Sequence, residues 1–140
     1  MIDLINQTSL TLESARVLAG EALRQAKAIG KCMHVTIVDA AGHVLVYQRM
    51  PGAPYPGREF SEKKAYTAVS FKKSTAVWKD RLAENPHLAA GLSQHPDVAM
   101  IGGGLPITID GAVVGAIGIA GGLEEDDITV AEATLEAFGL

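Results

Sequence analysis

The chain has 140 residues, which fits one domain spanning residues 1–140 and leaves little length for a second. Hydrophobic residues make up 48% of it and charged residues 20%, a balance that excludes intrinsic disorder, and the 5% of aromatic residues disfavours a pocket built from stacked rings. The net charge of −4 argues against nucleic acid as the main partner.

The first part of the chain predicts a helix followed by a β-hairpin. Apolar residues recur at spacings of three and four over residues 11–29, the pattern of an amphipathic helix with Thr11 as N-cap and Gly30 as C-cap. Residues 33–50 contain two β-branched, apolar runs joined by turn residues at 39–42, so they predict an antiparallel hairpin.

A loop and two further helices are predicted after the hairpin. Residues 51–57 contain three prolines and predict a loop, after which a second helix begins with Ser61 as N-cap and ends at Phe71. Ser74 is expected to cap a short helix that ends before Asn85-Pro86, because the residue before a proline avoids the helical region.

The last third of the chain predicts strands around a glycine-rich segment and then a helix. Strands are predicted at residues 98–101, 105–109 and 112–120. A final helix is expected to begin at Asp126 or Asp127 and to end at Phe138. Because tight turns join consecutive strands, this order predicts an α+β fold with a largely antiparallel sheet and helices packed on it.

Charge is unevenly distributed along the chain. Between Arg58 and Arg81 seven basic residues stand against three acidic ones, whereas residues 121–140 carry six acids and no base. Either these runs are two solvated faces, or the basic segment attracts a small anion.

Three features bear on the cellular compartment. The N-terminus lacks the basic and apolar regions of a signal peptide, and the longest run free of strongly polar residues, 112–123, is far shorter than the roughly 20 residues that span a bilayer. The single cysteine, Cys32, forms no internal disulfide. We therefore expect a cytoplasmic protein without a membrane partner.

The four histidines do not pair at the spacing of a metal site. His34 on a predicted strand and His43 near a turn are candidate metal or haem ligands, with a buried structural or solvent-facing role as the alternative for each. Cys32 and Tyr47 are weaker candidate iron ligands.

Gly102-Gly103-Gly104 precedes a predicted strand rather than a helix, which disfavours a phosphate-binding loop. The segment predicts a bulge, which either turns backbone N–H groups toward a ligand or has a structural role only.

Arg49 ends an apolar strand and enters the proline-rich loop, and arginine suits recognition of carboxylate or phosphate. Lys63 and Tyr66 could complete a site for a small anion, with surface ion pairing as the alternative. One hypothesis is therefore an enzyme that acts on a small carboxylate by tautomerisation, deamination or hydrolysis. Arg49 and Lys63 would then hold the carboxylate, Tyr66 or a nearby acid would move protons, and the N–H groups of Gly103 and Gly104 would stabilise an oxyanion.

Five segments in register resemble the GlcG/HbpS haem-binding protein family, which includes the C-terminal domain of PduO-type corrinoid proteins. The resemblance spans roughly residues 10–138. The segments are Val38-Asp39-Ala40-Ala41-Gly42-His43, Arg49-Met50-Pro51-Gly52-Ala53, Lys64-Ala65-Tyr66-Thr67-Ala68, Gly103-Gly104-Leu105-Pro106-Ile107 and the glycine-rich run from Asp110 to Gly121.

The resemblance implies a profilin-like α+β fold, with a five-stranded antiparallel sheet and helices packed against it, assembled into a homo-oligomer. It also implies haem or another tetrapyrrole as ligand, since some relatives bind haem or iron, while others belong to operons for small-molecule catabolism. The family usually has Asn at the position of Lys63 and Ser at that of Ala120, and a lysine suits an anionic ligand better. No axial ligand is carried over to a residue of this chain.

Overall fold

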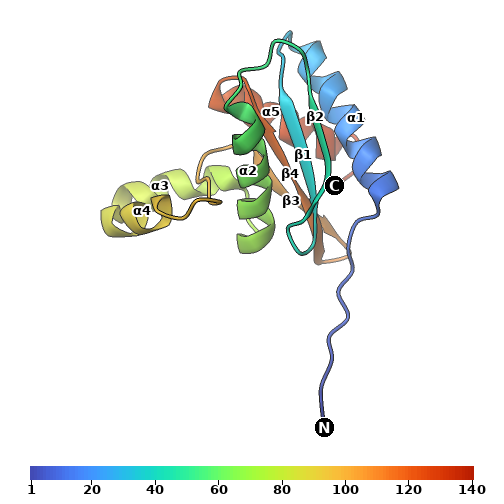
Figure 1. The fold of residues 1–140 in the computed structure, drawn as a ribbon, viewed down its shortest axis with the longest axis vertical. Coiled ribbons are helices and arrows are strands. Elements are labelled where there is room, and N and C mark those ends of the chain that lie inside the picture. Colours follow the sequence, from blue (N-terminus) through green and yellow to red (C-terminus); the bar gives the residue numbers. More distant parts are fainter.

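The computed structural model describes residues 1–140 and contains a four-stranded antiparallel sheet with helices on both faces (Figure 1). The strands are β1 (His34–Asp39), β2 (Val44–Arg49), β3 (Gly104–Ile109) and β4 (Ala112–Ala120). The helices are α1 (Leu12–Ala28), α2 (Gly57–Phe71), α3 (Trp78–Glu84), α4 (Pro86–Ser93) and α5 (Glu124–Glu136), with a 3-10 turn, η1 (Thr75–Val77), before α3. The strand order is β2-β1-β4-β3, so β2 and β3 form the edges.

The sheet buries a different set of side chains on each face, because successive strand residues point to opposite sides. Val35 and Ile37 of β1 belong to the larger apolar core, together with residues of α1 and α5. Val38 packs with Ala65 and Ala68 of α2 in a smaller core. Helices α1 and α5 therefore cover one face of the sheet and α2 covers the other (Figure 1).

The inner surface of α1 consists mainly of small side chains. Ala15, Ala19, Ala22 and Ala26 recur at helical spacing, and each is at most 1% exposed. Thr11 caps the helix by accepting a bond from a backbone N–H of the first turn at 3.1 Å. The predicted amphipathic helix and its N-cap are confirmed.

Helix α2 lies directly on the glycines of the opposite face. A Cβ at Gly118 would collide with the carbonyl oxygen of Ser61, and a Cβ at Gly104 would collide with that of Lys64. Glycine at these strand positions therefore permits close contact between helix and sheet. The contact places α2 over β1, β3 and β4 and leaves the edge strand β2 largely uncovered.

The sheet differs from the one implied by the family resemblance, because it has four strands rather than five. Residues 98–101, predicted as a strand, pair with no other strand. Instead, the N–H of the buried Ala99 donates to Thr67 Oγ1 on α2 at 2.9 Å. A side chain thus satisfies a backbone group that a neighbouring strand would otherwise bind. The α+β class and the antiparallel sheet are confirmed, and the profilin-like likeness is not.

Two helices begin about one turn before their predicted caps. Helix α2 begins at Gly57, so Ser61 lies inside it, buried, and donates to a carbonyl of the preceding turn at 2.9 Å. Helix α5 begins at Glu124, which places Asp126 and Asp127 in its first turn. Helix α2 begins directly after Pro56, and proline is favoured at the start of a helix. In α5 the helix dipole stabilises the acidic side chains of the first turn, so the helix begins before Asp126 and Asp127.

The first nine residues form an arm that extends away from the sheet (Figure 1). Its large apolar side chains, at Met1, Ile2, Leu4 and Ile5, are all at least 84% exposed. They therefore bury almost none of their surface against the rest of the chain. None of the helices has both the length and the apolar character needed to cross a membrane.

Candidate ligand-binding site

Two adjoining clefts lie along the side of α2 that faces the uncovered strand β2. The first, the His34 cleft, has a volume of about 600 Å³ and is lined by His34, Tyr47, Arg49, Tyr55, Pro56, Arg58 and Glu59. The second, the Tyr66 cleft, has a volume of about 440 Å³ and is lined by Gly42, Glu59, Glu62, Lys63, Tyr66, Pro96 and Asp97. Because Glu59 borders both clefts, they are neighbours along the helix.

His34 is fully buried at the floor of the first cleft, and both of its ring nitrogens have partners. Nδ1 lies 2.7 Å from the hydroxyl oxygen of Tyr47, and Nε2 lies 2.7 Å from the carbonyl oxygen of Pro54. A carbonyl only accepts, so Nε2 carries a hydrogen and the neutral ring accepts the Tyr47 hydroxyl at Nδ1. Neither nitrogen has a free lone pair, which disfavours His34 as a direct metal ligand.

The cationic side chains of the His34 cleft have no anionic partner within the protein. Arg49 comes from the end of β2 and Arg58 from the first turn of α2. Neither forms an ion pair, and the only carboxylate that lines the cleft is that of Glu59. Two unpaired guanidinium groups against one carboxylate favour an anionic ligand here.

The Tyr66 cleft brings Lys63 and Tyr66 together, as the sequence suggested, but in acidic surroundings. Three carboxylates line it, from Glu59, Glu62 and Asp97. Lys63 is the only cation among its lining residues, and Arg49 lies in the neighbouring cleft. Arg49 and Lys63 therefore do not surround a common small carboxylate.

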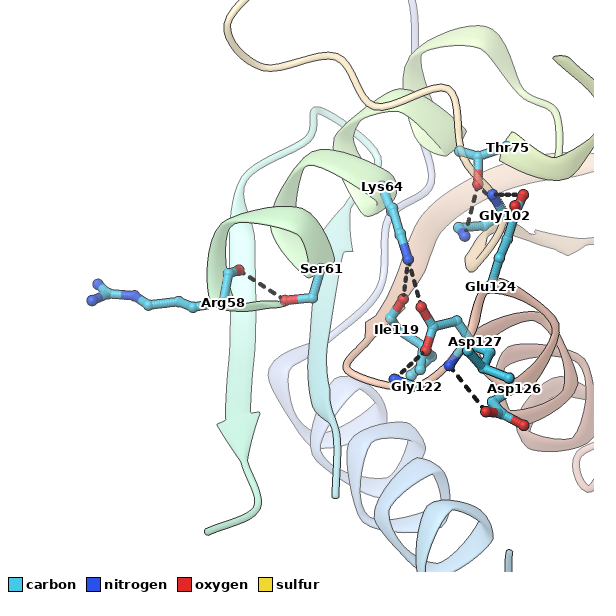
Figure 2. Close-up of polar contacts among 12 residues, drawn as sticks. Arg58, Ser61, Lys64, Thr75, Gly102, Ile119, Gly122, Glu124, Asp126 and Asp127 are labelled. Carbon is cyan, nitrogen blue, oxygen red and sulfur yellow. Dashed lines mark hydrogen bonds and ion pairs between the residues drawn. The ribbon is translucent and has the colours of Figure 1, made fainter. Parts of the chain in front are cut away.

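Gly103 and Gly104 line neither of these clefts, because they lie under α2 beside β4. The N–H of Gly104 already donates to Thr75 Oγ1 at 2.9 Å, and the carbonyl of Gly103 accepts from Ile119 at 2.9 Å. The N–H of Gly102 is bound to Glu124 Oε1 at 2.8 Å (Figure 2). One of the two N–H groups expected to stabilise an oxyanion, that of Gly104, is thus already bound within the fold, and the carboxylate-enzyme hypothesis is not favoured.

The other candidate iron ligands lie outside the clefts. His43 is in the turn between β1 and β2, with 81% of its side chain exposed and Nδ1 3.6 Å from Asp39 Oδ2. Cys32 is exposed and lines neither cleft. No three His, Cys, Asp or Glu side chains of the chain are grouped as a metal site.

A buried ion pair lies on the other side of α2 (Figure 2). Lys64 Nζ donates to Asp127 Oδ2 at 2.8 Å and to the carbonyl of Ile119 at 2.9 Å, while Asp127 Oδ1 accepts from the N–H of Gly122 at 3.0 Å. The two side chains are 3% and 5% exposed. Burial raises the pKa of the Asp127 carboxyl, and the bonds from Lys64 and Gly122 offset part of that rise. The pair joins α2, β4 and α5.

Lys64 belongs to the basic run between Arg58 and Arg81, and nothing in that charge pattern predicts a buried pair with Asp127. Helical spacing was the signal that could have revealed its burial. Lys64 precedes the inward-pointing Ala68 by one turn, so the two residues lie on the same face of the helix. Tyr47 was only a weak candidate, and its alternation with Arg49 along β2 was the sign that both face one side of the sheet.

Comparisons with known proteins agree with the motifs found in the sequence. The family model described as "Haem degrading protein HbpS-like" matches residues 10–136. The corrinoid adenosyltransferase PduO of Salmonella typhimurium is 33% identical over 94% of this chain, but the match spans only 40% of PduO.

Two solved structures resemble the chain over nearly its whole length. A double mutant of the Streptomyces reticuli HbpS has a TM-score of 0.87 and 35% identity, covering 98% of this chain and 92% of its own. A PduOC:heme complex has a TM-score of 0.85 and 31% identity, covering 94% of this chain and 96% of its own. The chain therefore belongs to the HbpS-like family, as its five motifs in register indicated.

Proposed function

We propose that this protein binds haem, or a closely related anionic tetrapyrrole, in the His34 cleft. The observation that carries the proposal is the pair of guanidinium groups, of Arg49 and Arg58, that flank the cleft without a carboxylate partner. A haem-complex structure among its relatives supports the ligand class.

The residues of the cleft fit such a ligand. Propionates would pair with Arg49 and Arg58, since arginine binds carboxylates in a forked geometry. The ring of Tyr55, which is 88% exposed, offers a flat apolar surface at the mouth of the cleft. Bound haem would supply an iron atom that takes a protein ligand and can change its oxidation state.

Hemin titration, followed by the shift of the Soret band, tests the proposal. We expect saturable binding by the wild-type protein, and weaker binding when Arg49 and Arg58 are both replaced by Gln. Losing even one charge-assisted hydrogen bond of about 1.5–3 kcal/mol weakens affinity by about tenfold or more.

The matched control removes two positive charges elsewhere. Arg16→Gln with Lys27→Gln alters α1, which covers the other face of the sheet, and should leave hemin affinity unchanged. Absence of saturable binding by the wild-type protein, or an equal loss in both double variants, would contradict binding in the His34 cleft.

We also propose that the protein self-associates through its N-terminal arm. A groove of about 400 Å³ lies along α1 and the edge strand β3, lined mainly by apolar side chains of Leu10, Val17, Leu18, Ile107, Ile109, Phe138 and Leu140. The exposed apolar residues of the arm complement this groove, and a second copy of the chain is the occupant that supplies them. Docking the arm of one subunit in the groove of another would bury both apolar surfaces.

A further inference from the structure

We infer that Tyr47, positioned by His34, is the ligand that binds ferric haem iron in the His34 cleft. This inference rests on the proposed haem-binding function and adds to it the residue that would hold the iron.

The position of Tyr47 suits a ligand better than that of any other side chain in the cleft. Its ring stacks on that of His34, with centroids 5.9 Å apart and an interplanar angle of 23°. Tyr47 is 37% exposed at the cleft, whereas His34 beneath it has no exposed surface. The phenol directs its hydrogen to His34 Nδ1 at 2.7 Å, so the oxygen lone pairs remain available to a ligand in the cleft.

His34 is held in the orientation that this bond requires. Its Nε2–H donates to the carbonyl of Pro54 at 2.7 Å, which fixes the ring and turns Nδ1 toward Tyr47. The imidazole fits under α2 because Gly57 has no side chain, and a Cβ there would collide with the ring. Outer partners of this kind orient metal ligands and increase their basicity. His34 is therefore a positioning residue, and Tyr47 is the group that would hold the iron.

The other possible oxygen ligands of the cleft lack such a partner. Tyr55 is 88% exposed and makes no side-chain hydrogen bond, so nothing accepts its phenolic proton. Glu59 is exposed and lies between the two clefts. Only Tyr47 combines access to the cleft with a proton acceptor at hydrogen-bond distance.

Binding of ferric iron by Tyr47 would require an acceptor for the phenolic proton, and His34 Nδ1 lies at hydrogen-bond distance from the hydroxyl. With haem bound, Tyr47 would hold the ferric iron through its phenolic oxygen and its proton would pass to His34 Nδ1, so no oxidant or reductant would be needed. The His34 ring would then donate one bond to the Pro54 carbonyl and one to the phenolic oxygen, so its positive charge would have an opposite charge beside it. Phenolate is a known ligand of ferric haem.

The test compares hemin complexes of the wild-type protein, Tyr47→Phe and Tyr55→Phe by hemin titration and resonance Raman spectroscopy. We expect a phenolate-to-iron(III) charge-transfer signature in the wild-type and Tyr55→Phe complexes and none in Tyr47→Phe. Tyr47→Phe should also lower hemin affinity by more than about tenfold, since loss of an outer partner alone costs about 10–100-fold. Tyr55→Phe is matched, because it removes a hydroxyl from the same cleft.

Each outcome separates this inference from the proposed function. If wild-type protein binds hemin and Tyr47→Phe gives the same spectrum and affinity, the ligand assignment is wrong and haem binding stands. If the wild-type protein does not bind hemin, both are wrong. His34→Gln should keep the phenolate signature with reduced affinity; if that variant does not fold, the comparison of the two tyrosine variants decides alone.

Discussion

Lys64 is a residue on which the stability of the fold depends, because both partners of its ion pair with Asp127 are buried. Its ammonium group is the only cation within reach of Asp127, and both side chains have lost nearly all contact with water. Breaking such a pair leaves a buried carboxylate without its counter-charge. This lowers the free energy of unfolding far more than breaking an exposed ion pair does.

We therefore expect Lys64→Met to lower the free energy of unfolding by about 3–5 kcal/mol. The control is Lys63→Met, because the neighbouring lysine is half-buried, forms no ion pair and should change stability by no more than about 0.5 kcal/mol. Urea unfolding of both variants measures the difference. Similar losses would mean that the pair does not stabilise the fold.

Single residues were also where prediction from sequence was weakest. A lysine in a basic run is usually solvated, so charge alone placed Lys64 on the surface. His34 was recognised as a candidate, but the sequence does not reveal that Pro54 binds its second nitrogen, a contact across 20 positions of the chain. Such roles depend on tertiary contacts that local patterns do not encode.

Close packing between α2 and the sheet depends on glycine in β4. At Gly118 a Cβ would meet the Ser61 carbonyl and would lie 2.8 Å from the backbone nitrogen of Ala65. Both neighbours are helix backbone, which cannot move away without shifting α2 and the clefts beside it.

We expect Gly118→Ala to destabilise the protein by about 1–3 kcal/mol through overpacking. Gly20→Ala is the control, because Gly20 lies on α1 with nothing within 4 Å of the added methyl, and it should stabilise by about 0.5–1 kcal/mol. Thermal unfolding distinguishes them by opposite shifts of Tm. A neutral Gly118→Ala would refute this account of helix-on-sheet contact.

Sequence patterns predicted helices, strands and turns better than they predicted the roles of single residues. The alanine spacing of α1, the hairpin of β1 and β2, and the Asp110-Gly111 turn between β3 and β4 all follow from local chemistry. The prediction of a strand at residues 98–101 was wrong. Their apolar character does not show what binds their backbone, and the N–H of Ala99 is bound by Thr67 of α2 rather than by a strand. Elements were thus predictable where local pattern decides, and not where the partner decides.

The molecule as a whole leaves apolar surface exposed on its N-terminal arm and beside β3. Proteins that remain monomeric rarely expose connected apolar surfaces of this kind, which supports self-association.

We expect light scattering coupled to size-exclusion chromatography to show an oligomer for the wild-type chain and a smaller species for Ile2→Asp with Leu4→Asp. The double variant Asn6→Asp with Gln7→Asp adds the same charge to polar positions of the arm and should stay oligomeric. A monomeric wild-type protein would exclude the proposed arm exchange, and dissociation of both variants would show that charge rather than apolar contact is responsible.

The central claim is that the His34 cleft binds haem between Arg49 and Arg58 with Tyr47 on the iron. A crystal structure of the protein grown with hemin tests it most directly. The account predicts haem between β2 and the start of α2, with its propionates at the two arginines and its iron at the Tyr47 oxygen. Haem found in the Tyr66 cleft or elsewhere, or iron bound by a residue other than Tyr47, would contradict it.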